Sequence, residues 1–346
     1  MTEQKRKWLE FGLSALIVAA LGGLFWYQLQ NHPNFYNSGF HEMMGTFAQI
    51  TVAASDEQQA QQWIDTAFEQ MKKINREMND HDPNSPISQL SLTAHLQPVA
   101  VSPELFEVIE ASIRYSQLSD GAFDITVGPE VQLWRQMQKT GQQPDPNALA
   151  AAKAKVGYEK LILDKTNRTV KFAVEGMKLD VGAIAKGYAV DLAVKTLQQK
   201  GVVGGMVDIG GNIRCFGTGP GKGGQWLIGL QDPRKDNSIL LKLRLNDMAV
   251  ATSGDYRRFA VVGGQSYSHI LNPRSAESVK ELASVSIIAP TATDADALST
   301  TVSVLGKDKG LALIKRLENT AAIIITSQEP DKVIQTPGMQ RFVEKE

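Results

Sequence analysis

The middle of the chain contains the stretch Leu179-Asp-Val-Gly-Ala-Ile-Ala-Lys-Gly-Tyr-Ala-Val-Asp191. It begins as the end of an apolar strand, turns at Gly182 and passes through small residues into a helix. A hydrophobic core does not require Asp180, Lys186 and Asp191 around such small residues, whereas a site where backbone closely approaches a charged ligand does. The alternative is an ordinary strand-to-helix turn with a solvated lysine, and this stretch alone leaves both interpretations open.

The composition is that of a globular protein. The 346 residues suggest one large domain or two closely packed ones, and 42% hydrophobic content is enough for a substantial core. The formal net charge is -1, with no basic block beyond the first few residues, which argues against a nucleic-acid partner. Cys215 is the only cysteine, so no intrachain disulfide forms and the fold depends on its core.

The N-terminus differs from the rest of the chain. Lys5-Arg-Lys7 precedes an uncharged, largely apolar run from Phe11 to Tyr27, which ends in three aromatic residues typical of a membrane interface. A cleaved signal peptide is the alternative, but no small-x-small cleavage site follows the run, and a lipoprotein signal would need a cysteine there. We therefore predict an uncleaved transmembrane anchor within residues 1–30, a linker over 31–42 and a folded domain over 43–346 outside the cytoplasm.

Residues 43–346 contain both helix and strand patterns without strict alternation, which favours an α+β fold with mixed or antiparallel sheets. Apolar residues at helical spacing predict a helix over 57–78, and Ser102-Pro103 predicts a helix start. A strand over 205–214 contains paired glycines, which indicate a bulge or a close backbone approach. The other predicted elements are helices near 185–200, 294–305 and 308–317, a hairpin over 158–174, and strands over 47–53, 226–231, 239–245, 249–252, 259–262, 285–288 and 321–326.

Two groups of side chains could carry chemistry. Asp296 and Thr300 are four residues apart on a predicted helix, so their oxygens face the same way and suit a hard cation such as Mg2+. The alternative is a capped helix start. His269 ends a short strand before an Asn-Pro turn, and a histidine at a sheet edge near a cleft suits a general base. A lone histidine is, however, more often structural than catalytic.

Seven segments, in order along the chain, resemble the signature motifs of the FAD:protein FMN transferases, the ApbE family. They are the stretch quoted first and Met44-Gly-Thr46, Gly121-Ala-Phe-Asp124, Asp208-Ile-Gly-Gly-Asn212, Ser253-Gly-Asp255, Ser268-His-Ile270 and Asp296-Ala-Leu-Ser-Thr300-Thr-Val-Ser-Val-Leu-Gly306. The resemblance covers nearly everything after residue 43. It implies the T-fold-like, mixed-sheet architecture of that family, with packed helices.

The resemblance also implies an activity. Members of the family are Mg2+-dependent enzymes that cleave the pyrophosphate of FAD, transfer the FMN half through a phosphoester bond to a threonine or serine of another protein, and release AMP. They act outside the bacterial cytoplasm, on flavoprotein subunits of membrane redox complexes such as the sodium-pumping NADH:quinone oxidoreductase. The expected location is therefore the inner membrane, with the catalytic domain on the periplasmic side, which agrees with the predicted anchor.

The motifs of the family assign roles to particular residues. His269 is expected to be the base that takes the proton from the acceptor hydroxyl. Asp296 and Thr300 are expected to bind the metal, together with the backbone carbonyl of Ala183 and with Ser299. The residues expected to line the FAD site are Met44, His81, Ala122, Phe123, Asp124, Asp180, Lys186 and Ile270. His81 stands where the family often has a tyrosine.

One motif departs from the family pattern. Relatives commonly continue the histidine motif as His-Ile-x-Asp-Pro-x-x-Gly, whereas this chain has His269-Ile-Leu-Asn-Pro-Arg-Ser-Ala276. The missing carboxylate and glycine leave the shape of this loop open. Two alternative functions also remain: a FAD pyrophosphatase that gives FMN and AMP, and a non-catalytic FAD-binding or delivery protein. The metal pair and His269 argue against mere binding, but transferase and pyrophosphatase would share the same metal site.

Overall fold

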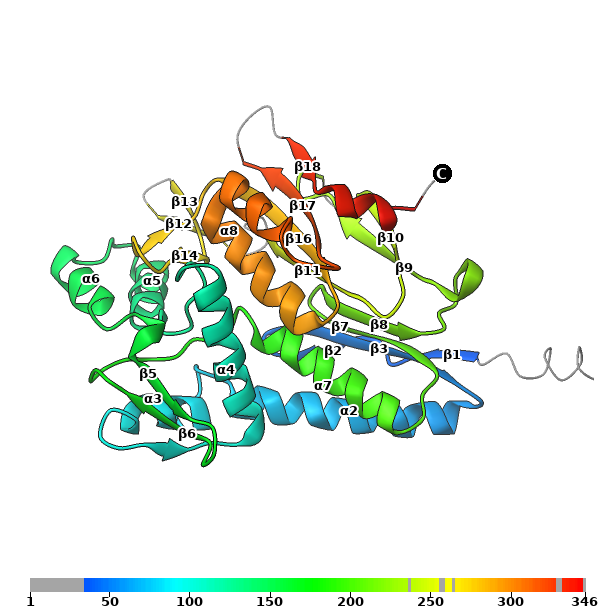
Figure 1. Ribbon diagram of the computed structural model, residues 1–346, viewed down its shortest axis with the longest axis horizontal. Helices are drawn as coiled ribbons and strands as arrows, with labels where there is room; N and C mark the ends of the chain where they lie inside the picture. The colour runs from blue at the N-terminus through cyan, green and yellow to red at the C-terminus, as the bar shows by residue number, and fades with distance from the viewer. Residues whose placement is uncertain (1–33, 236–237, 255–258, 263–264, 328–331, 345–346) are drawn as a thin grey trace, which may run out of the picture.

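The computed structural model describes residues 34–235, 238–254, 259–262, 265–327 and 332–344 (Figure 1). The predicted anchor within residues 1–30 lies outside the described residues. Among the residues that are described, no helix is both long and apolar enough to cross a membrane.

Most helices begin where the sequence supplies a capping side chain. The helices are α2 (Glu57–Glu77), α3 (Pro86–Thr93), α4 (Pro103–Leu118), α5 (Gly128–Thr140), α6 (Pro146–Lys153), α7 (Ala185–Gln199) and α8 (Ala292–Ile314). Asp56, Ser102 and Thr291 accept hydrogen bonds from first-turn N–H groups of α2, α4 and α8. The N-cap residue of α7 is Ile184, which offers no side-chain cap, so the first turn of α7 needs an acceptor from elsewhere.

The strands form one large sheet and several small ones. They are β1 (Asn34–Asn37), β2 (His41–Met43), β3 (Thr46–Ala54), β4 (Val99–Ala100), β5 (Leu161–Asp164), β6 (Thr169–Phe172), β7 (Gly204–Ile209), β8 (Asn212–Gly217), β9 (Trp226–Gln231), β10 (Ile239–Leu245), β11 (Ala249–Gly254), β12 (Phe259–Val262), β13 (Gln265–Ser268), β14 (Leu271–Asn272), β15 (Glu277–Ser278), β16 (Leu282–Ala289), β17 (Ala321–Thr326) and β18 (Val333–Gln335). The large sheet has nine strands in the order β1-β3-β7-β8-β11-β16-β17-β18, with β2 also pairing with β3.

The large sheet separates two hydrophobic cores. Because successive residues of a strand face opposite sides, Val285 and Ile287 of β16 pack under α2, α7 and α8, while Ile288 packs under the β9–β10 hairpin. Figure 1 shows α2 and α7 side by side along one face of the sheet and the β9–β10 hairpin away from them. The molecule therefore has three layers, with the sheet in the middle.

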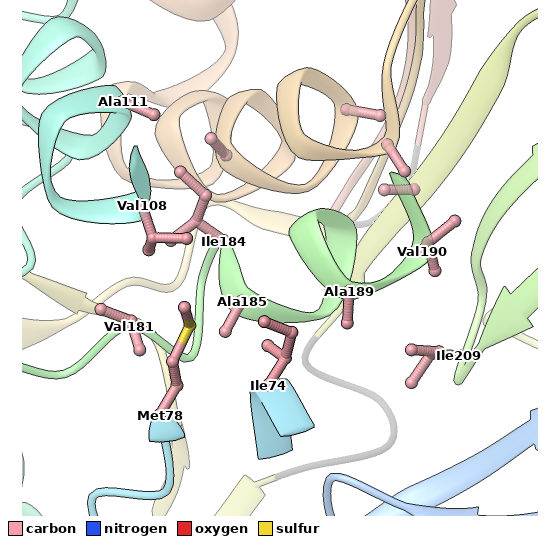
Figure 2. Packing of buried hydrophobic residues seen from close by; sticks show 14 of the residues in the cluster. Ile74, Met78, Val108, Ala111, Val181, Ile184, Ala185, Ala189, Val190 and Ile209 are labelled. Carbon is pink, nitrogen blue, oxygen red and sulfur yellow. The ribbon is translucent and has the colours of Figure 1, made fainter. Parts of the chain in front are cut away.

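The stretch quoted first lies in the larger core. Figure 2 shows its apolar residues surrounded by side chains of α2, α4 and β7. The residues of the stretch that the figure labels are Val181, Ile184, Ala185, Ala189 and Val190, and the surrounding ones are Ile74, Met78, Val108, Ala111 and Ile209. All of them are buried, so the turn before α7 is fixed by packing from three sides.

Most predicted elements are confirmed. The α+β class is found, and every pairing between named strands is antiparallel, so the sheets are not mixed as the family resemblance suggested. The strand predicted over 205–214 is wrong: Gly210 and Gly211 have φ of 59° and 89° and form the turn of a hairpin between β7 and β8. The two helices predicted near 294–305 and 308–317 are found within α8, where Gly306, with a non-helical φ of 76°, separates two helical segments.

Some elements were not predicted. Helices α3 and α5 lie in segments for which no helix or strand was predicted, and residues 34–43, mostly predicted as linker, contribute β1 and β2. Both of these strands pair with β3, which makes residues 34–43 part of the large sheet.

Candidate functional site

A cleft with a volume of about 1200 Å³ lies where several of the motif-bearing segments meet. Its walls come from the β2–β3 turn, α5, the turn before α7, the β7–β8 turn, β11, the segment that carries His269, and α8. All residues predicted for the site except Ser299 line this cleft: Met44, His81, Ala122, Phe123, Asp124, Asp180, Ala183, Lys186, His269, Ile270, Asp296 and Thr300. The structure thus collects side chains that lie up to 256 positions apart in the chain, from Met44 to Thr300.

One corner of the cleft holds the predicted metal residues. Asp296 is 4% exposed, its Oδ2 accepts the N–H of Gly187 at 2.9 Å, and its Oδ1 lies 3.5 Å from Lys186 Nζ. Thr300 lies one turn further along α8, with Oγ1 3.3 Å from Ser253 Oγ. Asp296 Oδ1 and Thr300 Oγ1 are therefore the oxygen atoms at the cleft wall that can coordinate a cation.

Ser299 is the predicted residue that the structure does not bring to the cleft. It is fully buried, its hydroxyl donates to the Asp296 carbonyl at 2.8 Å, and its Oγ is 2.7 Å from Ser253 Oγ. Ser299 contacts Ser253, whose hydroxyl in turn lies beside Thr300 Oγ1, so Ser299 helps to position Thr300.

The donor set of this corner fits Mg2+. The described residues contain no group of three or more His, Cys, Asp or Glu side chains able to hold a metal. Mg2+ is commonly bound by one or two protein oxygens plus water and substrate phosphates, and it does not need such a cage. Asp296 and Thr300, with the backbone of Ala183 in the same cleft, are a set of this kind.

Helices α7 and α8 cap each other at this corner. The Asp296 carboxylate on α8 accepts the first-turn N–H of Gly187 on α7, which supplies the cap that Ile184 cannot. In return, Asp191 on α7 accepts the N–H groups of Ala292 and Thr293 at 2.9 and 2.8 Å, in the first turn of α8.

This arrangement changes the interpretation of Asp191. Its carboxylate also accepts from Arg214 Nη1 at 2.6 Å, so its oxygens are engaged by protein groups. Asp191 is therefore a structural residue of the α7–α8 contact, and the sequence pattern that suggested a charged ligand beside it applies only to Asp180 and Lys186.

The helices approach closely enough to exclude a side chain at Gly187. A Cβ there would lie 2.2 Å from the Ala292 carbonyl oxygen and 2.8 Å from Asp296 Cβ. Glycine is required at this position for close packing. Its backbone conformation is not the reason, because its φ angle is one that any residue can adopt. The small residues of the stretch thus bring the Asp296 carboxylate against the start of α7.

A second cluster of charges lies at the start of the same stretch. Arg135 of α5 donates from Nη1 to Asp80 at 2.6 Å and from Nη2 to Asp180 at 2.9 Å. Burial raises the pKa of Asp180, the neighbouring Asp80 carboxylate raises it further, and Arg135 opposes both effects. His81 Nε2 lies 3.8 Å from Asp80 Oδ1 and is largely exposed.

Asp124 is placed in the cleft wall but serves its own loop. Its Oδ1 accepts the N–H and the hydroxyl of Thr126 at 2.8 and 2.7 Å, and its Oδ2 accepts the N–H of Tyr158 at 2.8 Å. Burial raises the pKa of this carboxyl, and these hydrogen bonds oppose the shift. Asp124 therefore fixes the backbone that presents Ala122 and Phe123 to the cleft.

The segment that carries His269 retains its turn despite the departure from the family motif. Asn272 Oδ1 accepts the N–H of Arg274 at 2.9 Å, a bond that an aspartate would also make. Ala276 has φ of 59°, the left-handed conformation that glycine adopts readily. His269 itself is exposed at the bend between β13 and β14, on the cleft wall.

Helix α5 holds this segment in place. Trp134 Nε1 donates to the Ala276 carbonyl at 3.0 Å, and its ring lies 5.4 Å from that of Tyr267. Trp134 thus contacts the segment on both sides of His269. Sequence reasoning missed Trp134, Arg135 and the whole of α5, although the Gly128-Pro129 pair followed by spaced apolar residues is a helix-start signal.

Comparisons with known proteins agree on one family. The model of the ApbE family matches residues 44–324. The chain is 33% identical over 263 residues to the FAD:protein FMN transferase of Haemophilus influenzae, covering 74% of this chain and 75% of that protein. It is 33% identical over 277 residues to one from Klebsiella pneumoniae, covering 80% and 85%.

Solved structures give the same answer. The ApbE protein of Thermotoga maritima superposes with a TM-score of 0.82 at 31% identity, covering 90% of this chain and 100% of that chain. The flavin transferase ApbE of Vibrio cholerae superposes with a TM-score of 0.80 at 27% identity, covering 90% and 99%.

Proposed function

Because this chain belongs to the ApbE family, we propose that it is a Mg2+-dependent transferase that moves the FMN half of FAD onto a threonine or serine hydroxyl of another protein. The names of its relatives support flavin transfer to proteins. The observation that carries the finer proposal is the presence of Asp296, Thr300 and His269 in the walls of one cleft. A protein that only bound FAD would need neither a metal corner nor a base.

The chemistry is a displacement at phosphorus. The acceptor oxygen attacks the phosphorus of the FMN half, a P–O bond forms, and the P–O bond to the AMP phosphate breaks. His269 accepts the proton of the acceptor hydroxyl, an effect worth about 10²–10⁴-fold in typical enzymes. AMP leaves with the electron pair of the broken bond.

The charges around the metal corner serve the same step. Bound Mg2+, held by Asp296, Thr300 and the Ala183 carbonyl, would neutralise the pyrophosphate and stabilise the leaving phosphate. The Lys186 ammonium, 2.9 Å from the Gly182 carbonyl, adds positive charge at the turn. Met44, His81, Phe123 and the other lining residues would enclose the rest of FAD.

The proposal extends to location and partner. The apolar run within residues 1–30 supports a single anchor in the bacterial inner membrane with the catalytic domain on the periplasmic side. The acceptor would then be a flavoprotein subunit of a membrane redox complex. Protease digestion of intact spheroplasts tests this topology, because a periplasmic domain would be cut and a cytoplasmic one protected.

Mass spectrometry tests the activity. The full chain in detergent is incubated with FAD, Mg2+ and the flavoprotein subunit of a sodium-pumping NADH:quinone oxidoreductase made without covalent flavin. We expect the subunit to gain the mass of one FMN on a threonine or serine, with equimolar AMP. EDTA and His269→Ala should abolish the gain, whereas His95→Ala, outside the cleft, should not. Release of free FMN and AMP with the subunit unmodified would instead establish the pyrophosphatase.

A further inference from the structure

The rim of the cleft carries two exposed phenylalanines. Phe40 and Phe47 are 73% and 57% exposed, and both line the cleft, whereas Asp296 at 4% lies deep in it. Their rings contact each other edge to face, with centroids 6.4 Å apart. Among the large hydrophobic side chains that the structure describes as exposed, these two are the ones that line the cleft, and they are also the aromatic ones.

The backbone holds this pair in position. The two rings flank β2 and the tight β2–β3 turn, in which Met44 and Gly45 have φ of 49° and 69°. The loop before Phe40 is fixed by hydrogen bonds in both directions between Ser38 and Ile50, at 2.9 and 3.0 Å. The aromatic pair is therefore preorganised, which lowers the entropy cost of binding to it.

The cleft offers more room than a small-molecule site requires. Pockets for small ligands typically measure about 300–1,000 Å³, and this cleft is about 1200 Å³. The transfer reaction needs a second substrate, a polypeptide whose hydroxyl must pass the rim to reach the metal corner. Exposed aromatic side chains at such a rim are typical of protein-binding surfaces.

We infer that Phe40 and Phe47 form the docking surface for the acceptor polypeptide, and that they bind an apolar side chain a few residues from the acceptor hydroxyl. This inference rests on the proposed transferase function and extends it to acceptor recognition. The aromatic pair selects the acceptor segment, while the metal corner and His269 act on its hydroxyl.

Steady-state transfer measurements test the inference. The double variant Phe40→Ser/Phe47→Ser, as a full chain in detergent, is assayed with FAD, Mg2+ and increasing amounts of the flavin-free oxidoreductase subunit. We expect kcat/KM for the subunit to fall at least tenfold, mainly through KM, while the dissociation constant for FAD changes less than twofold. Phe40→Leu/Phe47→Leu, which keeps an apolar surface, should restore most of the loss.

A matched control uses two other exposed apolar residues. Leu92 and Leu96 are 62% and 73% exposed but do not line the cleft, so Leu92→Ser/Leu96→Ser should transfer FMN at the wild-type rate. Unchanged kcat/KM in the phenylalanine variant would overturn the inference. So would a parallel loss of FAD affinity, which would make the rings part of the flavin site. A loss seen only when both proteins share phospholipid vesicles would assign the rings to the bilayer.

The outcome also separates this inference from the function on which it depends. If the wild-type chain transfers no FMN to the subunit, the proposed function fails and the inference fails with it. If the wild-type chain transfers FMN and the phenylalanine variant does so equally well, only the inference fails.

Discussion

The two walls of the cleft are held in different ways. At the α7–α8 wall, backbone N–H groups and carboxylates pair reciprocally: Asp296 caps α7 and Asp191 caps α8. At the α5 wall, the segment around His269 depends on a few side chains, chiefly Trp134 and its hydrogen bond to the Ala276 carbonyl. At the α7–α8 wall, two carboxylates bind the backbone N–H groups that begin the two helices. At the α5 wall, the contacts are between individual side chains and one carbonyl, and other side chains could replace them.

The α5 wall also contains an unsatisfied group. Glu130 is fully buried in the first turn of α5, and neither carboxylate oxygen has a hydrogen-bond partner. Burial, with a smaller contribution from the Asp124 carboxylate, raises the pKa of Glu130 to about 8, and the positive charge of Lys153 opposes this shift. The α5 wall contains a buried carboxylate without hydrogen bonds, whereas each carboxylate at the α7–α8 wall caps a helix, so fewer polar contacts hold the α5 wall in place. Changes at the α7–α8 wall should therefore cost more than changes at the α5 wall.

The largest effect is expected from Gly187→Ala. The new methyl group would overlap the Ala292 carbonyl, which is backbone and cannot rotate away, so α7 and α8 must separate. We expect the free energy of unfolding to fall by about 3 kcal/mol or more, and FMN transfer to be lost with it. Thermal unfolding of the full chain in detergent measures the loss. Gly338→Ala is the control, because its nearest neighbour is at 3.5 Å, and wild-type stability in Gly187→Ala would mean that the helices do not need this contact.

A smaller and pH-dependent effect is expected from Glu130→Gln. The folded protein holds a proton on Glu130 up to a pKa of about 8, whereas the unfolded chain releases it near 4.5. Wild-type stability should therefore decrease as the pH rises from 4.5 towards 8, by up to about 1.4 kcal/mol per pH unit. Glu130→Gln does not titrate, so it should match the wild type at pH 4.5 and exceed it at pH 8. If the free energy of unfolding depended on pH in the same way for both proteins, the Glu130 carboxylate would have hydrogen-bond partners in solution that keep its pKa near 4.5.

The contrast between local and long-range contacts explains which site residues could be predicted from the sequence. Asp296 and Thr300 are one helical turn apart, so it could be predicted from the sequence that their side chains lie together. Asp191 lies in the stretch quoted first, and the sequence left its role open between a ligand site and an ordinary turn. Its observed role, capping α8, joins residues 101 positions apart. Nothing local marks a partner at that distance.

Other failures have local causes. Gly210 and Gly211 were assigned to a strand interior because apolar residues flank them on both sides, yet two residues of positive φ are what a tight hairpin turn needs. Helix α5 was not predicted, although Pro129 in its first turn is a helix-start signal, and Trp134 and Arg135 were missed with it. The contacts of these two side chains are tertiary, and no periodicity encodes them.

An effect on catalysis alone is expected from Trp134→Phe. This change keeps an aromatic ring beside Tyr267 but removes the hydrogen bond to the Ala276 carbonyl, worth about 1 kcal/mol. The segment that carries His269 should become less well positioned, so kcat for FMN transfer should fall about fivefold, while the affinity for FAD stays the same. Trp63→Phe, on α2 outside the cleft, is the matched control. A fall in FAD affinity without a change in kcat would place Trp134 in substrate binding instead.

The smallest effect is expected from Ala276→Gly, which restores the glycine typical of the family motif. The left-handed φ of 59° costs a non-glycine residue about 1–2 kcal/mol. The change would relieve this strain, but it would also remove a methyl group that is 1% exposed, worth about 0.8 kcal/mol, and would make the unfolded chain more flexible. Because the opposing terms are similar, the free energy of unfolding should change by less than about 0.5 kcal/mol.

A matched variant separates these terms. Arg168 has φ of 48° in the β5–β6 turn but an exposed side chain, so Arg168→Gly relieves the same strain without losing buried surface. It should raise the free energy of unfolding by about 0.5–1 kcal/mol, measured by thermal unfolding alongside Ala276→Gly. If Ala276→Gly instead stabilised the chain as much as Arg168→Gly, the methyl group would contribute nothing to packing at the α5 wall. If it destabilised the chain by more than 1 kcal/mol, that wall would be packed as tightly as the contact between α7 and α8, and the contrast between the two walls would not hold.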